Sequence, residues 1–330
     1  MNKGKILIVG GAGYIGSINV KMFLSCGYEV VVVDNLNTGH ISSVDKRAKF
    51  YQLDIRNKSE LVKVLEVEKV DAVVHFAALS LVGVSMKDPL AYFDNNVYGM
   101  ITLLQAMQEV GVNKIVFSSS AATYGEQEEM PLTENSPTEP TSVYGETKLM
   151  MERIMKWCDK CIGIKYVSLR YFNAAGASSD GELGEDHNPE THLIPLILQV
   201  PLNKRDHISI YGNDYPTKDG TCIRDYIHVE DLASAHIKAV EYLLEGNKSN
   251  IFNLGSGTGQ SVNEMIETSE KVVNQTIKKE YVDRRPGDPA VLIASNKKAK
   301  EVLKWENTKN LEDIISSAYN FHKKHPDGLK

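Results

Sequence analysis

The sequence predicts an α/β protein whose main part is a doubly wound parallel sheet, joined to a smaller α/β domain. Two observations support this prediction. Short apolar runs rich in β-branched residues alternate with helix-like segments through the first half of the chain. The first run stops at glycines spaced three residues apart, and polar residues follow the ends of several others. Parallel strands give such continuous apolar runs because helices cover both faces of their sheet.

Length and composition are those of an ordinary globular protein. The chain has 330 residues, more than one hydrophobic core usually serves, so two interlocked domains are expected. A net charge of -6, without a basic arm or stripe, gives no footprint for nucleic acid. The apolar run at the N-terminus is too short and too glycine-rich for a signal peptide or a membrane span. We therefore expect a cytoplasmic protein with no membrane partner.

Four cysteines in a chain of this length do not form a disulfide framework. Cys158 and Cys161 form a Cys-x-x-Cys pair, which occurs in redox centres and in halves of zinc sites. A second Cys or His pair with ligand spacing does not accompany it. We interpret both residues as free thiols at a helix end and expect no metal.

The chain opens on a strand, 5–9, a tight turn and a helix from about residue 14 to residue 25. We expect Gly10 to turn the chain, Gly13 to let a pyrophosphate approach bare backbone, and Gly16 to let the helix pack closely on the strand. Unpaired N–H groups at the helix start then face the phosphates. The glycine spacing alone is a weak indication, and a plain tight turn is the alternative.

A second buried strand, 29–33, ends at Asp34. A carboxylate there accepts hydrogen bonds from both ribose hydroxyls and repels a 2′-phosphate, so the sequence favours NAD over NADP. A turn aspartate without a ligand is the alternative. The third strand, 50–53, ends at Asp54 and Ile55, which we expect to border the adenine.

The fourth strand, 70–76, contains His75 in its apolar run. A histidine in such a setting is more often a core residue than a catalytic one, and we assign it no role. Ala77 and Ala78 follow, and their small side chains either leave room beside a cofactor or simply pack.

A long helix is expected over 89–110, with Asn95 and Asn96 in its middle. Amides inside a helix usually face solvent or a neighbouring element. The fifth strand, 114–117, leads directly into the serines 118–120. Hydroxyl groups therefore gather at the carboxyl end of a sheet strand, where open α/β sheets bind ligands.

Tyr144 and Lys148 lie one turn apart on one face of a predicted helix. A nearby ammonium and a cationic nicotinamide ring both favour the phenolate, so we expect the pKa of Tyr144 to fall from about 10 towards neutrality. Tyr144 is then a general base for a substrate hydroxyl, and Ser120 hydrogen-bonds the same oxygen. The Tyr/Lys spacing is common on ordinary helices, but its coupling to the glycines, Asp34 and the serine run favours catalysis.

The second half supplies supporting elements. In chain order we expect a strand at 165–169, a helix capped by Glu230 and Asp231 that runs to about residue 244, a strand at 250–254, helices that begin at Ser261 and Asn296, a packed Trp305, and a solvated helix end at Lys323 and Lys324.

The longer motifs resemble the extended branch of the short-chain dehydrogenase/reductase superfamily, and within it the bacterial UDP-glucose 4-epimerases. The resemblance covers nearly the whole chain, and these motifs are more specific than the dinucleotide glycines. They are SSSAATYG at 118–125, RYFN at 170–173, GEDH at 184–187, DGTCIRDYIHV at 219–229 and RRPGD at 284–288.

The resemblance implies a Rossmann-type fold and an isomerase of galactose metabolism that keeps NAD bound. Tyr144 would remove the proton of the sugar 4-hydroxyl while hydride leaves C4 for NAD, and Lys148 would hold the ribose and tune the phenol. The 4-keto sugar would rotate about its bond to the diphosphate and take the hydride back on its other face. Such chemistry needs a site that binds the nucleotide diphosphate tightly and the hexose loosely. NAD is expected to stay bound as a prosthetic group.

The site residues predicted in this way fall into three sets. The catalytic set is Tyr144, Lys148 and Ser120. The cofactor set is Gly10, Gly13, Tyr14, Ile15, Gly16, Asp34, Asn35, Asp54, Ile55, Phe76, Ala77, Ala78, Asn95, Ser118, Tyr144, Lys148 and Tyr171. The substrate set is Ser120, Tyr144, Asn173, Tyr211, Arg224, Arg285, Asp288 and Val291.

Four substrate residues have distinct expected roles. In the family Asn173 contacts the diphosphate, whereas a turn amide is its plain alternative. Arg224 and Arg285 offer bidentate forks that suit phosphate oxygens, although exposed arginines are usually only solvated. Tyr211 takes the position near the uracil, and a core aromatic is the competing interpretation.

Three positions depart from the commonest family pattern. Ile18 replaces a frequent histidine and Ser80 replaces a lysine that reaches the cofactor phosphates, so both changes loosen NAD in this interpretation. Val291 stands where a residue's bulk limits the sugar pocket. Because it is small, we expect UDP-GlcNAc and UDP-GalNAc to be substrates as well.

Three other functions remain open from the sequence. A nucleotide-sugar 4,6-dehydratase shares the first oxidation, but Ala121 and Ala122 stand where it would carry acid groups. A UDP-glucuronate 4-epimerase or decarboxylase differs only in a few sugar contacts. A non-catalytic NAD-binding regulator would have no reason to keep Ser120, Tyr144 and Lys148 together.

The expected organisation has two parts. Residues 1–172 form the NAD-binding Rossmann domain, to which later segments contribute strands, and residues 173–330 mainly form the UDP-sugar domain. The resemblance also implies a homodimer that pairs through helices such as 89–110 and 144–157.

Overall fold

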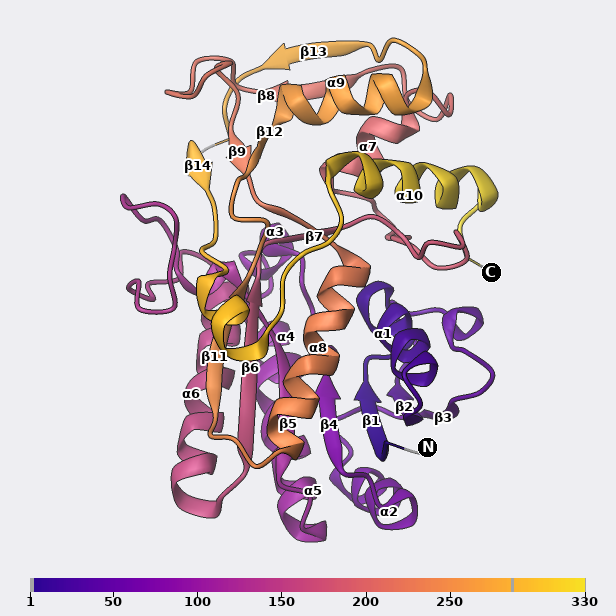
Figure 1. Ribbon diagram of the computed structural model, residues 1–330, viewed down its shortest axis with the longest axis vertical. Helices are drawn as coiled ribbons and strands as arrows, with labels where there is room; N and C mark the ends of the chain where they lie inside the picture. The colour runs from indigo at the N-terminus through magenta and orange to yellow at the C-terminus, as the bar shows by residue number, and fades with distance from the viewer. Residues whose placement is uncertain (1–2, 286–287, 330) are drawn as a thin grey trace.

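A computed structural model describes residues 3–285 and 288–329, and the lower part of Figure 1 is a parallel sheet between two layers of helices. All neighbouring strands of this seven-stranded sheet pair in parallel. The predicted fold class is confirmed. Across the sheet the strands are β11 (Asn250–Leu254), β6 (Lys165–Tyr171), β5 (Lys114–Ser120), β4 (Ala72–His75), β1 (Lys5–Val9), β2 (Glu29–Asp34) and β3 (Lys49–Gln52).

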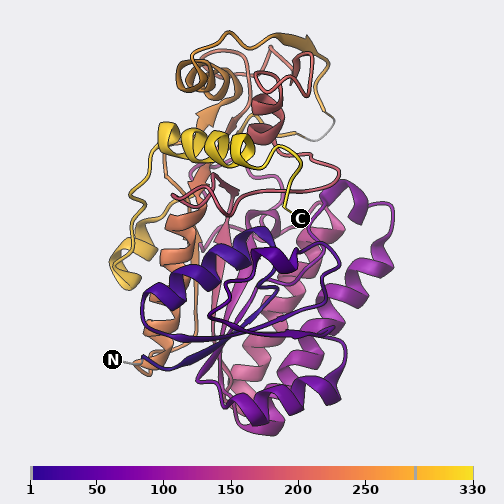
Figure 2. The same cartoon turned by 90° about the vertical axis from the view of Figure 1, so that its right-hand side faces the viewer.

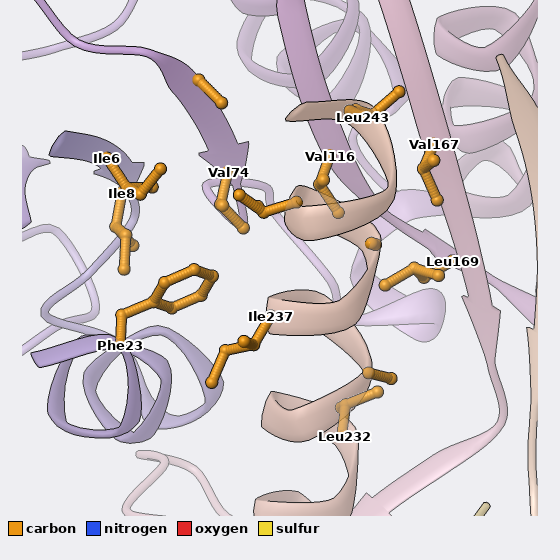
Figure 3. Packing of buried hydrophobic residues seen from close by; sticks show 14 of the residues in the cluster. Ile6, Ile8, Phe23, Val74, Val116, Val167, Leu169, Leu232, Ile237 and Leu243 are labelled. Carbon is orange, nitrogen blue, oxygen red and sulfur yellow. The ribbon is translucent and has the colours of Figure 1, made fainter. Parts of the chain in front are cut away.

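One face of the sheet is covered by α1 (Tyr14–Ser25) and α8 (Val229–Leu244). Alternate side chains of a strand point to opposite faces, and Ile6 and Ile8 of β1 join the buried cluster on this side. Figure 3 shows Phe23 of α1 pointing toward Ile8, with α8 beside it. After Lys5, β1 is apolar, and on this face it is buried by helices from the start and the second half of the chain.

The opposite face is covered by α2 (Lys58–Glu68), α5 (Gly99–Val110) and α6 (Val143–Ile162). Leu7 and Val9 of β1 lie fully buried in the cluster that these helices complete. Figure 2 shows these helices along one side of the sheet, with α1 on the other. Both faces of each central strand are thus apolar, which explains the unbroken hydrophobic runs of the sequence.

The long helix expected before β5 is continuous but changes its winding. It begins as α4 (Pro89–Tyr92), passes through a π-helical segment, η2 (Phe93–Tyr98), and ends as α5. The π segment carries Asn96, which is completely buried. The amide of Asn96 accepts from the backbone N–H of Leu79 at 2.8 Å and donates to Thr147 Oγ1 on α6 at 3.1 Å. The Asn96 amide therefore links the loop after β4 to α6.

The upper part of Figure 1 is smaller and consists of short strands and three helices around a second core. Its strand pairs are β7 (Asn173–Ala175) with β10 (Tyr226–His228), β8 (Ile208–Tyr211) with β13 (Lys279–Val282), and β9 (Ile223–Arg224) with both β12 (Gln260–Ser261) and β14 (Val291–Leu292). Its helices are α7 (Leu193–Gln199), α9 (Val262–Val273) and α10 (Leu311–Lys324). The remaining short segments are η1 (Ile41–Ser43), α3 (Val82–Ser85), η3 (Ala121–Thr123) and η4 (Ala299–Leu303).

The predicted helix starts are confirmed with one correction. Ser261 forms a capping box with the third residue of α9, as the sequence predicts. The N-cap of α8 is His228, whose side chain accepts from the N–H of Glu230, so Glu230 and Asp231 lie in the first turn and do not cap. The Asp231 carboxylate instead accepts from the segment that follows η4, beside the buried Trp305.

The chain crosses back to the sheet after building much of the upper part. Helix α8 and strand β11 both lie in the sheet layers, although they follow residue 172. Among the described residues, no helix is both long and apolar enough to cross a membrane.

Candidate active site

A cavity of about 470 Å³ opens along the carboxyl ends of the parallel strands, where open α/β sheets bind their ligands. Every residue of the predicted cofactor set except Asp54 lines it. Ser120 and Asn173 of the substrate set line it too. Nearly all of the predicted cofactor residues thus lie at this cavity, while their roles remain predictions.

The glycine turn has the backbone that the sequence demands. Gly10 has a φ of +83°, and a Cβ there would lie 2.5 Å from the amide nitrogen of Ala77. A Cβ on Gly16 would lie 2.0 Å from the carbonyl oxygen of Gly10, so α1 packs directly on the turn. At Gly13 the nearest atom is 3.6 Å away, which leaves its cavity side open. The predicted structural roles of Gly10 and Gly16 are confirmed.

Asp34 is nearly buried at the end of β2, and the backbone holds its carboxylate in place. Its two oxygens accept from the N–H groups of Ala12 at 2.9 Å and Leu36 at 2.8 Å. Each oxygen keeps a lone pair for a further donor at the cavity.

Asp54 does not line the cavity, which corrects the prediction that it borders the adenine. Its carboxylate pairs with Arg56 at 2.8 Å and accepts from the amide of Asn35 at 3.1 Å. The Arg56 guanidinium holds the pKa of Asp54 well below its usual range. Asp54 therefore acts on the cavity only through Asn35, while Ile55 lines the wall itself.

Helix α6 brings the catalytic set together at its first turn. Ser142 caps the helix, with its Oγ accepting from the N–H of Gly145 at 3.1 Å. Lys148 Nζ lies 5.7 Å from the centre of the Tyr144 ring and donates to the carbonyl of Ser118 at 2.7 Å. The Ser120 hydroxyl lies beside that of Tyr144 and lowers its pKa.

Burial controls the ionisation of this group. It raises the pKa of Tyr144 to about 12, although the bond from Ser120 acts in the opposite direction. It also lowers the pKa of Lys148 to about 7, against the opposing effect of Glu152. The protein alone therefore does not lower the pKa of Tyr144 as expected. Burial raises this pKa by more than a nearby lysine charge lowers it, and burial also destabilises the charged form of Lys148.

Buried polar contacts hold the ends of β5 and β6 behind the site. Glu152, one turn after Lys148, accepts from Ser119 Oγ at 2.6 Å and from Arg170 Nε at 2.9 Å. The hydroxyls of Ser118 and Tyr171 are hydrogen-bonded as well.

His75 is a core residue, as expected. Its ring stacks on Phe117 with centroids 5.9 Å apart, and neither ring nitrogen has a hydrogen-bond partner among the described residues. Burial lowers the pKa of His75 to about 3, so the ring stays neutral in the folded protein.

A second cavity of about 240 Å³ adjoins the first, and Asn173 lines both. Arg224, Tyr211, Arg285 and Asp288 of the substrate set line it. Arg224 is paired with Asp288, and the guanidinium of Arg285 lies 3.9 Å from the centre of the Tyr211 ring. Two guanidinium groups thus face a cavity that is continuous with the catalytic one.

Val291 lines neither cavity, whereas its neighbour Leu292 lines the first. Successive residues of a strand point to opposite sides, so on β14 the cavity wall is formed one position after the residue that the sequence predicts. Of the other departures, Ser80 lines the first cavity, but Ile18 packs in a buried cluster with Leu183 and does not reach it.

Sequence reasoning missed two groups of lining residues. Arg205 and the segment 191–196 line the second cavity without any motif to mark them. Glu185, His187 and His192 line the first, and the GEDH motif marked two of these without indicating a role. The free thiols Cys158 and Cys161 lie near the end of α6, as predicted.

Comparison with known proteins gives a consistent result. The sequence matches the family described as GDP-mannose 4,6 dehydratase over residues 7–318. It is 56% identical to a UDP-glucose 4-epimerase of Lacticaseibacillus casei over 325 residues, which is 98% of each chain.

Solved structures are equally similar. A crystal structure of a UDP-glucose 4-epimerase matches with a TM-score of 0.97 and 52% identity over 99% of both chains. That of the UDP-glucose 4-epimerase from Brucella ovis in complex with NAD matches with a TM-score of 0.94 and 43% identity, over 96% of this chain and 97% of the other.

Proposed function

The chain belongs to the UDP-glucose 4-epimerases, an NAD-dependent group within the family matched over residues 7–318, and from this premise we propose which residues carry its reaction. The enzyme interconverts UDP-glucose and UDP-galactose by inverting sugar C4. One observation carries the residue assignment: Tyr144, Lys148 and Ser120 meet in a cavity at the carboxyl ends of the parallel strands.

The first cavity suits NAD. The open backbone at Gly13 offers a close approach for a pyrophosphate, and the free lone pairs of Asp34 suit a ribose diol. We propose that the lining members of the cofactor set hold NAD, with Asp54 acting only through Asn35. When bound, NAD takes a hydride from sugar C4 and returns it to the opposite face.

Tyr144 holds and moves the proton of the 4-hydroxyl in this proposal. Its hydroxyl lies beside that of Ser120, which places both groups within reach of one substrate oxygen. A pKa of about 12 would leave Tyr144 protonated, and positive charge beside its ring is what makes it a base. Lys148 supplies part of that charge from 5.7 Å, and an oxidised nicotinamide ring in the cavity supplies the rest.

The second cavity grips the nucleotide diphosphate. Arg224 and Arg285 present guanidinium groups to it, which bind phosphate oxygens well. The wall of the first cavity near the sugar is made by Ala121, Ala122 and Leu292, which have no side-chain hydrogen-bonding groups. A hexose held by its diphosphate and lightly by its ring can turn over within the site, as inversion at C4 requires.

The main test uses the purified protein with UDP-galactose and no added cofactor. We expect UDP-glucose to form, because NAD remains in the first cavity through purification. Absence of conversion, with or without added NAD, would contradict the proposal. Tyr144→Phe is the matched control, since it removes only the hydroxyl that moves the proton.

We further propose that 2-acetamido sugars are substrates, and we assign this breadth to Leu292 in place of Val291. Leu292 lines the cavity that holds Tyr144, whereas Val291 does not line it. A residue without a large ring at this wall leaves room for an N-acetyl group on C2.

Leu292→Tyr and Val291→Tyr form a matched pair that tests this assignment. Leu292→Tyr should lower turnover of UDP-GalNAc at least tenfold more than that of UDP-galactose, and Val291→Tyr should leave the ratio unchanged. A wild-type rate with UDP-GalNAc below about a thousandth of the UDP-galactose rate, a difference of about 4 kcal/mol, would reject the proposal.

The dehydratase alternative is not favoured. Elimination of water needs an acid and a base beside the sugar, and Ala121 and Ala122 line the cavity at the places where that class carries them. A UDP-glucuronate specificity is not favoured either. The relatives compared above are named UDP-glucose 4-epimerases, which gives this alternative no support.

We also propose a homodimer that pairs through the π-containing helix and α6. Large apolar side chains are exposed on these neighbouring helices, including Leu90 at 77%, Tyr98 at 51% and Trp157 at 61%. Large apolar side chains exposed on neighbouring helices support an interface at this surface.

Trp157→Glu tests the dimer, because it places a charge on this surface. Sedimentation should show a monomer for Trp157→Glu and a dimer for both the wild type and Val67→Glu, a change at an equally exposed valine on α2. A wild-type monomer at micromolar concentration would contradict the proposal. The cytoplasmic location remains a prediction from the sequence, which fractionation of cells that express a tagged chain would test.

A further inference from the structure

Segment 185–192 gathers four potential metal ligands between the two cavities. It follows β7 and ends at the start of α7, in the upper part of Figure 1. Glu185, His187, Glu190 and His192 each offer one ligand atom, and these atoms all lie within 4.8 Å of one another. Glu185 is 6% exposed, so the cluster is anchored in the interior.

The donor atoms converge on a single point. His192 Nδ1 lies 2.8 Å from Glu185 Oε1 and 3.1 Å from Glu190 Oε1. His187 Nδ1 lies 3.2 Å from the same Glu185 oxygen and 3.9 Å from Glu190 Oε2. Ligands about 2.0–2.1 Å from a tetrahedral zinc ion are separated by roughly 3.3 Å, so these spacings need only small adjustments.

Lysine and arginine side chains do not balance the charge of the two carboxylates. Within the part of the chain that the structure describes, no lysine or arginine forms an ion pair with Glu185 or Glu190. His187 Nδ1 is buried and makes no hydrogen bond of acceptable geometry, although it faces a carboxylate oxygen. A ring nitrogen and a carboxylate oxygen that face each other need either a proton or a metal ion between them.

The carboxylate of Glu190 is also held in position by the backbone. Its Oε1 accepts from the N–H groups of Thr191 at 2.7 Å and His192 at 2.8 Å. Such a fixed carboxylate is the outer support that metal ligands commonly have.

We propose that Glu185, His187, Glu190 and His192 bind one divalent transition-metal ion of the zinc class. Two imidazoles and two carboxylates are hard-to-borderline donors that suit Zn²⁺, Co²⁺ or Mn²⁺. Four protein ligands close the coordination sphere, so the ion is structural and does not activate water.

The place of the cluster gives this ion a role. Glu185 and His192 line both cavities, and the His187 ring contacts the Tyr14 ring edge-to-face with centroids 6.4 Å apart. Tyr14 begins α1, directly after the glycine turn. The ion would stabilise the wall that the first and second cavities share. This structural role does not depend on which reaction the site performs.

Metal binding to the full-length protein tests the proposal without using activity. The purified chain is stripped with a chelator and titrated with Zn²⁺ in competition with a chromophoric chelator, and in parallel with Co²⁺. We expect one ion per chain and the intense visible absorption of tetrahedral Co²⁺. His192→Asn and His187→Asn should each weaken binding at least tenfold, whereas His207→Asn, at an exposed histidine that pairs with Glu280, should not.

A second measurement keeps the test valid if the variants fold poorly. Chelator should lower the Tm of the wild-type protein by several degrees, and one equivalent of Zn²⁺ should restore it. Binding below one equivalent, a Co²⁺ spectrum without tetrahedral bands, or equal affinity in His192→Asn and His207→Asn would overturn the proposal. A Tm that chelator does not change would identify the cluster as a histidine–carboxylate network alone.

Discussion

The two cavities of the site are framed by different kinds of secondary structure. The first lies on the ends of long buried strands, and its reactive groups, Tyr144 and Lys148, are fixed by a capped helix of 20 residues. The second is framed by strands of two to four residues, by loops and by the start of α7, and its charged groups, Arg224 and Arg285, contact other side chains of the same wall.

This difference matches what each cavity has to do. Chemistry requires reacting atoms held within a fraction of an ångström, which a parallel sheet with two helical layers provides. Binding of a diphosphate requires donors that can leave their resting partners and turn to a ligand. We therefore expect substitutions in the first cavity to change kcat and substitutions in the second to change KM.

Tyr144→Phe should have the largest effect. Loss of the hydroxyl removes the general base, which is worth about 10² to 10⁴ in rate, so kcat for UDP-galactose should fall by about 10³. KM should change less than threefold, because the ring and its packing remain. Steady-state kinetics with added NAD measures both constants. A variant with a raised KM and a normal kcat would show that Tyr144 serves binding and would remove the distinction between the cavities.

Arg224→Ala should show the opposite behaviour. A hydrogen bond to a charged group is worth about 1.5 to 3 kcal/mol, so KM should rise about 10- to 100-fold while kcat stays within a few-fold. Arg284→Ala is the matched control, since Arg284 stacks on Tyr215 and pairs with Asp214 but does not line the cavity. Equal effects of the two substitutions would mean that the family resemblance had misplaced the diphosphate.

His75 tests how completely the sheet below the first cavity excludes water. Its pKa is lowered to about 3 in the folded protein and is about 6.5 in the unfolded chain. From pH 6.5 down to about 3 the unfolded chain binds a proton that the folded protein does not, so acid destabilises the fold by about 1.4 kcal/mol per pH unit from this residue.

His75→Leu removes this titration. Between pH 7.5 and pH 5 the variant should therefore lose about 2 kcal/mol less stability than the wild type, as measured by urea unfolding. His207→Leu, at an exposed position, should leave the pH dependence unchanged. If His75→Leu and the wild type show the same pH dependence, the ring is hydrated and the sheet is less tightly closed than its burial indicates.

The first cavity was also the more predictable from sequence. Glycine at positive φ, β-branched runs and a tyrosine one turn before a lysine each have a local cause, so β1, α1 and the start of α6 follow from short stretches of residues. The π-helical winding around Asn96 could not be foreseen, because it depends on contacts with distant residues such as Thr147.

In the smaller upper part of the molecule, the sequence did not predict which single residues line the cavities. On β14 a shift of one residue exchanges the two sides of the strand. This two-residue strand lies in a continuous apolar run, 290–294, which offers no alternation to fix the register. This is why Leu292 and not Val291 lines the cavity. The sequence also did not predict the ligand cluster at 185–192. The spacing of its residues matches no common metal motif, and their side chains come together only because of the course of the loop.

The smallest predicted effect separates two aspartates at neighbouring strand ends. Asp34 faces the first cavity with both oxygens anchored, whereas Asp54 reaches it only through Asn35. Asp34→Asn should weaken NAD retention at least tenfold, because an amide gives up one acceptor and places a donor toward the ribose. Asp54→Asn should weaken it less than threefold, since the Asn35 contact is exposed and retains an acceptor. NAD released on dialysis, measured by absorbance, gives both numbers. Equal losses from the two variants would place Asp54 in contact with the cofactor and make the end of β3 part of the cavity wall.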